Sequence, residues 1–410
     1  MATPALDSSL LTRRGVLAAA AGTLLLTACG EQQGQRSDEG PATSTADPGR
    51  HELVIGASLE LTGRGAALGV LQQRAMEITV ESLNLTGIPV GNLRRAVRLE
   101  IRDNRSDPRE AARQATELTR RDQVHALVGG TSAETSMAIV EVAQNLQVPF
   151  VSLAAGDDIV LPLAQRTYIY KLTPDAGDVA RRMARLINSL EVRRVVLLAA
   201  DGLHGDSGVR AVRSALRDLD LELTRVVRLP ASGRSFTSAA RRAAAGGPDG
   251  VIVWGTAPDS GTAARELRRA GHRGPLFFDP GAVAEDTLIG SNAAAVEGAY
   301  AVHPACLAAS TLTTTTTAEL ARRDFTYRYI QRHGSFSGFA PYGSDAVRLL
   351  AAAARAATSV DRGRLRAYLQ TQVTEGISGG YAFAPIRHGG MERDSLGVYV
   401  VSQRAWTRYS

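Results

Sequence analysis

The sequence lacks the residue patterns that build metal centres, redox motifs and disulfide-stabilised folds. Among its 410 residues there are only two cysteines, Cys29 and Cys306, and the seven histidines are scattered singly. No Cys/His pair has the spacing of a zinc site or of a redox motif. We therefore expect no metal, no cofactor and no disulfide framework.

The positive charge of the chain comes almost entirely from arginine. Lys171 is the only lysine, so arginine accounts for nearly all of the 47 basic residues, and the formal net charge is +6. The arginines stand beside acidic residues, as in Arg109-Glu110 and Arg265-Glu266, and aromatic residues make up only 5% of the chain. The sequence has no basic stripe interleaved with aromatics, which argues against a nucleic-acid partner and is typical of a solvated surface.

Catalytic motifs are missing as well. The segment GSFSG at residues 334–338 has the wrong order for a nucleophile elbow, and no paired carboxylates form a recognisable acid–base motif. The loop at residues 63–69 has the glycine spacing G-x-G-x-x-x-G and lacks the acidic residue that a dinucleotide site requires, so we favour a tight turn there over a nucleotide site. We expect a binding protein and no enzyme, with catalytic residues that meet only in three dimensions as the alternative.

Long hydrophobic runs are confined to the N-terminus. The uncharged run at residues 15–28 follows Arg13-Arg14 and is shorter than the ~20 residues of a membrane-spanning helix, so residues 1–28 read as a signal peptide. The arginine pair also resembles a twin-arginine export signal, and an ordinary secretory signal fits equally well. The sequence LTAC at residues 26–29 resembles a bacterial lipobox, which implies that Cys29 carries lipid on the outer face of the cytoplasmic membrane.

Residues 29–51 are almost entirely polar or small and read as a flexible tether. About 360 residues follow, more than one compact core usually holds, which predicts two lobes. Short β-branched runs alternate there with helical periodicity, beginning with a strand at 53–59 and a helix at 69–84. The alternation of strands and helices begins again after Thr173-Pro174, so we expect two α/β lobes with parallel sheets. We interpret the threonine run at 312–317 as a surface insertion.

Several segments together resemble one known family. In chain order they are LTG at 61–63, DNRSDP at 103–108, LVGG at 127–130, VPFVS at 148–152, FTYRYIQRHG at 325–334 and YGSDA at 342–346. Their order is similar to that in the type 1 periplasmic binding proteins, in the leucine/isoleucine/valine-binding branch that serves ABC importers. The chain departs from that pattern at Asn104, where a second aspartate is usual.

The resemblance implies an α/β fold of two Rossmann-like lobes, with parallel central sheets joined by a three-strand hinge. With crossings near Thr173-Pro174, Gly298-Ala299 and Gly376-Ile377, lobe one would comprise residues 52–173 and 299–376, and lobe two residues 174–298 and 377–410. It also implies a monomer that captures a small molecule and delivers it to an ABC transporter permease. A ligand-sensing receptor of the same fold is the alternative, which gene neighbourhood would distinguish.

Ligands of open α/β sheets bind at the carboxyl ends of strands, beside helix N-termini that favour anions. Two such junctions, at residues 129–133 and 154–156, are expected to face the ligand. At the first of them, Thr131 and Glu134 could instead form a capping box. The resemblance adds positions in the opening turn and in lobe two. The expected binding residues are Leu68, Thr131, Ser132, Ala133, Ala154, Ala155, Gly156, His204, Thr256 and Asp279.

Two of these residues have particular interpretations. The resemblance places His204 where the family usually has a ligand-contacting tyrosine, with an exposed loop histidine as the alternative. Asp279 is interpreted as an acceptor for a cationic or N–H group, or as a turn cap. Where the family holds a carboxylate with two hydroxyls, this chain has Ala133 and Gly156, so we expect weak binding of branched-chain amino acids and a preference for another small carboxylate or an amide.

Overall fold

A computed structural model of the chain describes residues 52–230, 235–307 and 316–409. The expected signal peptide, the lipidated Cys29 and the tether lie outside the described residues, as does most of the threonine run at 312–317. No helix in the described ranges is long and apolar enough to cross a membrane.

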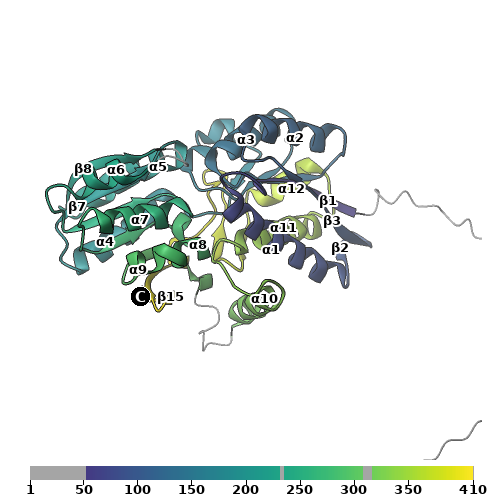
Figure 1. Ribbon diagram of the computed structural model, residues 1–410. Helices are drawn as coiled ribbons and strands as arrows, with labels where there is room; N and C mark the ends of the chain where they lie inside the picture. Colours follow the sequence, from purple (N-terminus) through teal and green to yellow (C-terminus); the bar gives the residue numbers. More distant parts are fainter. Residues whose placement is uncertain (1–51, 231–234, 308–315, 410) are drawn as a thin grey trace, which may run out of the picture. The chain divides into compact units, whose positions relative to one another are not determined.

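Two sheets, both mainly parallel, organise the chain (Figure 1). The six-stranded sheet has the order β2-β3-β1-β4-β5-β6, in which only the β2–β3 pair is antiparallel. Its strands are β1 (Glu52–Leu59), β2 (Ile88–Val90), β3 (Leu93–Asp103), β4 (Ala126–Gly129), β5 (Phe150–Ser152) and β6 (Ile169–Lys171).

The seven-stranded sheet has the order β15-β14-β11-β10-β9-β7-β8, with β14 and β15 antiparallel at one edge. Its strands are β7 (Arg194–Ala200), β8 (Glu222–Leu229), β9 (Gly250–Trp254), β10 (Leu276–Phe278), β11 (Tyr300–Pro304), β14 (Leu396–Ser402) and β15 (Ala405–Arg408). A small antiparallel pair, β12 (Val373–Glu375) and β13 (Gly380–Ala382), forms a separate sheet. The two expected α/β lobes are therefore present.

Helices cover both faces of each sheet. Around the first sheet, α2 packs on α3 and α1 packs on α11, on opposite sides in Figure 1. These first-lobe helices are α1 (Ala66–Asn84), α2 (Pro108–Arg120), α3 (Ala133–Asn145), α10 (Thr317–His333), α11 (Pro341–Ala356) and α12 (Arg362–Leu369). The second lobe has α4 (Ala176–Ser189), α5 (Leu203–Arg217), α6 (Thr237–Ala244), α7 (Asp259–Arg269), α8 (Glu285–Leu288) and α9 (Ala293–Val296).

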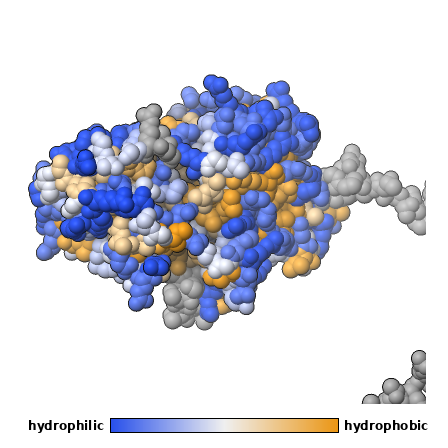
Figure 2. All heavy atoms as spheres, in the orientation of Figure 1, coloured by the Kyte–Doolittle hydropathy of each residue, from blue (hydrophilic) through white to orange (hydrophobic). Residues whose placement is uncertain are grey.

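Alternation along the central strands explains this layering. In β1, Leu53 and Ile55 belong to one buried cluster, whereas Val54 belongs to another that contains α2 and α3 residues. In β7, Val196 and Leu198 likewise face the α6 and α7 side. Successive side chains of a strand point to opposite faces, so a nearly continuous apolar run requires cover on both. The face drawn in Figure 2 is mostly hydrophilic, with apolar residues gathered where Figure 1 places α1 and α11.

Two expected lobe boundaries are corrected by the strand pairing. Residues 299–304 were assigned to lobe one, but β11 pairs with β10 and β14 in the seven-stranded sheet. The chain therefore crosses back after Pro304. Residues 377–391 were assigned to lobe two, yet they pack on lobe one: Ile377 N and Ser378 N donate to Asp345 of α11, and Gly389 forms a bridge with Lys171. The third crossing lies between Met391 and β14.

Candidate functional site

The carboxyl ends of both sheets meet around one cavity. Its outer part, the outer cleft, has a volume of about 390 Å³, within the range of small-molecule sites. Many of the first-lobe residues that line it follow β1 and β4, and second-lobe residues follow β7 and β9, the strands beside the change of direction in each sheet. The lining residues used below are Glu60, Arg64, Thr131, Ser132, Ala133, Glu134, Ala155, Asp201, His204, Thr256 and Phe339.

Glu60 lies at the end of β1 and reaches the N-terminus of α3. Its side chain is buried, and Oε1 accepts hydrogen bonds from Ser132 N at 2.8 Å and from Thr135 Oγ1 at 2.7 Å. A backbone N–H at the start of α3, where an anionic ligand would be expected, is thus already bonded to a carboxylate of the chain.

The capping box of Thr131 and Glu134, the alternative interpretation of this junction, is not formed. Ser132, not Thr131, is the N-cap of α3, and its Oγ accepts from Thr135 N at 3.3 Å. Thr131 Oγ1 instead donates to Gln72 Oε1 of α1 at 3.0 Å, while Glu134 Oε1 accepts from Leu203 N of the second lobe at 3.1 Å. Glu134 is therefore free of a helix-capping role and joins the two lobes.

The glycine-rich loop before α1 is a close-packed turn around Glu60. Gly63 has a φ of +81°, which favours glycine. A Cβ at Gly65 would collide with Oε2 of Glu60, and one at Gly69 would collide with the Glu60 carbonyl. The glycines thus bring the backbone close to Glu60.

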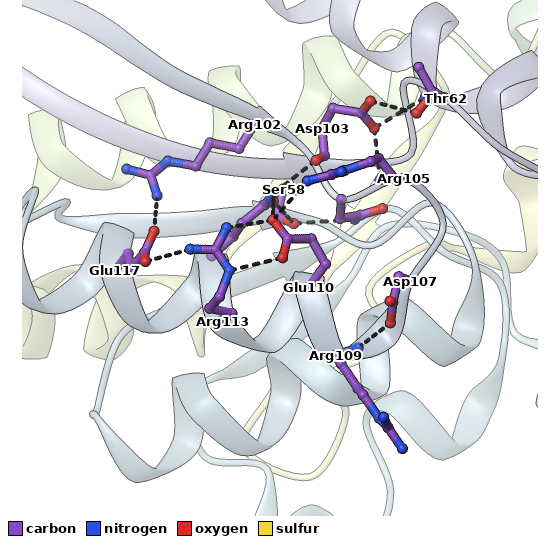
Figure 3. A network of polar contacts seen from close by, with 12 residues as sticks. Ser58, Thr62, Arg102, Asp103, Arg105, Asp107, Arg109, Glu110, Arg113 and Glu117 are labelled. Carbon is purple, nitrogen blue, oxygen red and sulfur yellow. Dashed lines mark hydrogen bonds and ion pairs between the residues drawn. The ribbon is translucent and has the colours of Figure 1, made fainter.

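A polar network fastens this loop to the end of β3 (Figure 3). Asp103 Oδ1 accepts from Leu61 N at 3.0 Å and from Arg105 N at 2.8 Å, and Oδ2 accepts from Thr62 Oγ1 at 2.6 Å. Burial raises the pKa of Asp103, but these hydrogen bonds outweigh it and hold the pKa below its usual value. Hydrogen bonds therefore hold the LTG segment (61–63) and the DNRSDP segment (103–108) against each other.

A smaller inner chamber continues the outer cleft, with which it shares Ala155, His204 and Phe339. Its volume is about 20 Å³, room for roughly one water-sized group. Trp254, at the end of β9, and Tyr342, in the first turn of α11, line it from opposite lobes. Both side chains are buried, and neither Trp254 Nε1 nor Tyr342 Oη has a hydrogen-bond partner among the described residues.

Tyr342 stays a hydrogen-bond donor at neutral pH. Burial, together with nearby Cys306, Asp345 and Asp279, raises the pKa of Tyr342 well above its usual value. An unpartnered buried donor is costly unless something accepts its proton. Both donor atoms are themselves buried, and the indole edge of Trp254 packs against Gly208 of α5, so neither is open to the chamber.

His204 and Asp279 form a pair beside this chamber. His204 lies in the first turn of α5, which begins at Leu203, and Nε2 is 3.0 Å from Asp279 Oδ2. Asp279 also accepts from Gly255 N at 2.8 Å and from Gly281 N at 3.1 Å, capping a short turn. His204 is therefore no exposed loop residue, and Asp279 performs the capping role held open for it while still lining the chamber.

Most of the expected binding residues gather at this cavity. Thr131, Ser132, Ala133 and Thr256 line the outer cleft, Gly156 and Asp279 line the inner chamber, and Ala155 and His204 line both. Leu68 and Ala154 do not line either part. Their side chains are buried in hydrophobic clusters, because Leu68 lies on the core face of α1 and Ala154 packs beneath α3.

Sequence reasoning missed Glu60, Trp254, Phe339 and Tyr342. The first two directly follow or end a strand, so the strand-end rule could have found Glu60 and Trp254. Phe339 and Tyr342 come from a return segment far along the chain, and only tertiary structure brings them to the cavity. Among the described residues no group of three or more His, Cys, Asp or Glu side chains could hold a metal ion.

Polar contacts join the lobes around the cavity. Arg210 Nη2 lies 2.8 Å from Asp158 Oδ2, Arg64 lies 3.7 Å from Asp259, and Ser337 Oγ donates to Val283 O at 3.2 Å. At the first crossing, the buried Lys171 Nζ donates to the carbonyl oxygens of Thr173 and Pro174 at 2.9 and 3.0 Å.

Comparisons with known proteins agree with this architecture. An extracellular ligand-binding receptor from Rhodopseudomonas palustris HaA2 is similar with a TM-score of 0.80 and 21% identity, covering 87% of this chain and 99% of that one. The branched-chain amino acid transporter substrate binding protein LivJ from Streptococcus pneumoniae, solved in complex with isoleucine, has a TM-score of 0.74 and 21% identity, covering 87% and 99%.

Sequence matches are more local. Glutamate receptor 2.9 from Arabidopsis thaliana is 24% identical over 124 residues, which is 30% of this chain and only 13% of that receptor. The sequence model of the family described as "Periplasmic binding protein" matches residues 52–404, nearly all of the described chain. With two α/β lobes, ligand-sized space between their strand ends and this match, the chain belongs to the periplasmic binding protein family.

Proposed function

We propose that this protein is an extracytoplasmic solute-binding lipoprotein that captures a small molecule between its lobes and delivers it to an ABC importer. The cavity of about 390 Å³ at the carboxyl ends of both sheets carries the proposal, because such a position suits ligand binding. No catalytic step is needed for this role, and neither a cofactor nor a second copy of the chain enters it.

The ligand class in this proposal is an amino acid, an amide or another small carboxylate. The neighbour solved with isoleucine supports a small polar molecule with an apolar part. Branched-chain amino acids themselves are expected to bind weakly, because Ala133 and Gly156 offer no hydroxyl to a carboxylate.

The direct test is a thermal-shift screen of small molecules against residues 52–410, followed by calorimetric titration of each hit. Ligand-dependent lobe closure should then lower the radius of gyration in small-angle scattering. A set of confirmed hits with no compaction at saturation would contradict capture by closure, and a screen without hits would contradict the binding role.

Lipid anchoring is the second part of the proposal and rests on the LTAC sequence at residues 26–29. Cys29→Ala should move the full-length protein from the membrane fraction to the soluble fraction, or leave an uncleaved precursor. Cys306→Ala is the matched control, since Cys306 is buried in the folded part and should not affect fractionation. Unchanged anchoring of the Cys29 variant would refute the lipoprotein assignment.

Ligand sensing is the second candidate function, favoured by the local match to a plant glutamate receptor. Delivery and sensing differ in their partner. Uptake of radiolabelled ligand should fall on gene deletion if the protein feeds an importer, and should be unaffected if it only signals.

A further inference from the structure

The outer cleft is acidic at the place where an anion would be expected. Glu60, Glu134 and Asp201 line it against one arginine, Arg64, which lies 3.7 Å from Asp259. Glu60 Oε1 takes the Ser132 N–H, while its Oε2 accepts no hydrogen bond from any described residue. A ligand carboxylate at the start of α3 would lose that N–H and would stand beside a buried carboxylate.

Among the described residues, the inner chamber offers an anion no arginine or lysine. Its lining includes the carboxylate of Asp279 and apolar residues such as Val179 and Phe339. Trp254 Nε1 and Tyr342 Oη belong to its wall, but both atoms are themselves buried and therefore closed to a ligand atom in the chamber. The chamber therefore suits a compact apolar group without negative charge.

We propose that the ligand is an uncharged or cationic molecule of the amide or amine type. Its N–H group faces Glu60, and its apolar part lies toward the inner chamber. Free carboxylates are rejected because Glu60 occupies the N-terminus of α3. This inference rests on the proposed function, and it narrows the ligand class by excluding anions.

The test screens residues 52–410 against a library with equal numbers of anionic, neutral and cationic small compounds, and titrates two matched pairs, isoleucine with isoleucinamide and benzoate with benzamide. Hits should be neutral or cationic, and each amide should bind about tenfold or more tightly than its carboxylate. In Glu60→Gln that preference should shrink by about tenfold, because the amide side chain keeps an acceptor for Ser132 N but carries no charge.

A control variant separates a ligand role from an effect on folding. Glu141→Gln removes an exposed carboxylate from α3, away from the N-terminus of that helix, and should keep the amide preference.

The outcomes are distinct. Anionic hits, a carboxylate that binds more tightly than its amide, or an unchanged preference in Glu60→Gln would overturn the inference while leaving the proposed function intact. A library without any hit would contradict the proposed function itself, and the inference would fall with it.

Discussion

Mild acid should destabilise the second lobe through His303. This residue lies in β11 and is fully buried, with Nδ1 at 3.0 Å from Pro304 O and with Nε2 unpartnered among the described residues. A Cβ at Gly338 would collide with the imidazole ring, so the ring has little room to move. Burial lowers the pKa of His303 to about 4.

The sign and size of the effect follow from linkage. In the unfolded chain a histidine titrates near 6.5, so between about pH 6.5 and about pH 4 the unfolded state binds a proton that the folded state refuses. Stability is therefore lost as pH falls through this window. At 1.36 kcal/mol per pKa unit the full loss is about 3 kcal/mol, of which about 2 kcal/mol should appear between pH 7 and pH 5.

Urea unfolding of residues 52–410 at pH 7, 6 and 5 measures this loss. His303→Asn is the comparison, because its amide can still donate to Pro304 O but does not titrate in this range. Its smaller side chain should lower stability by an amount that does not change with pH. Between pH 7 and pH 5 the wild type should lose about 2 kcal/mol more than the variant, and parallel losses in the two proteins would refute the assignment.

Three other substitutions probe the crossing and the cavity. Lys171→Met should lower the free energy of unfolding by about 3 kcal/mol in urea titrations, because Asp175 and the carbonyl oxygens of Thr173 and Pro174 lose their buried cation; a loss near zero would contradict this role. Glu134→Ala should raise the ligand-free radius of gyration and weaken ligand binding, whereas Glu141→Ala should do neither; identical scattering curves would count against Glu134 as a contact between lobes. His204→Ala should weaken binding of confirmed ligands and destabilise the fold by about 1–3 kcal/mol, since Asp279 loses a donor; unaltered affinity would remove His204 from the site.

Local sequence patterns were enough to predict the elements and the two-lobe fold, but not the lobe boundaries. Parallel strands buried on both faces have the same apolar appearance in either sheet. The sheet to which β11 belongs is decided by its pairing with β10 and β14, of which β14 is distant in sequence. Residues 377–391 are likewise held to lobe one by Asp345 and Lys171, contacts that no local pattern reveals.

Residues that line the cavity were predicted where topology alone fixes their position. Thr131 and His204 follow parallel strands, and the carboxyl ends of such strands must lie at one edge of a sheet. Side-chain direction was the weak step: Leu68 is in the correct turn but faces the core. Glu60 was overlooked because the comparison with the family concerned missing hydroxyls, whereas a carboxylate of this chain already accepts a hydrogen bond from the N-terminus of α3.

The contacts between the lobes are weak enough that a ligand can shift the equilibrium between an open and a closed form. Arg210 and Asp158 are 58% and 40% exposed, and Arg64 is 52% exposed; ion pairs of this kind are worth about 0–1 kcal/mol each. They help to orient the lobes relative to each other without making the closed form strongly favourable. A ligand shifts such an equilibrium only by binding the closed form better than the open one. Glu60 lines the outer cleft from the first lobe and Asp201 and Thr256 line it from the second, so a ligand that contacts both sides gains those contacts together only when the lobes are closed.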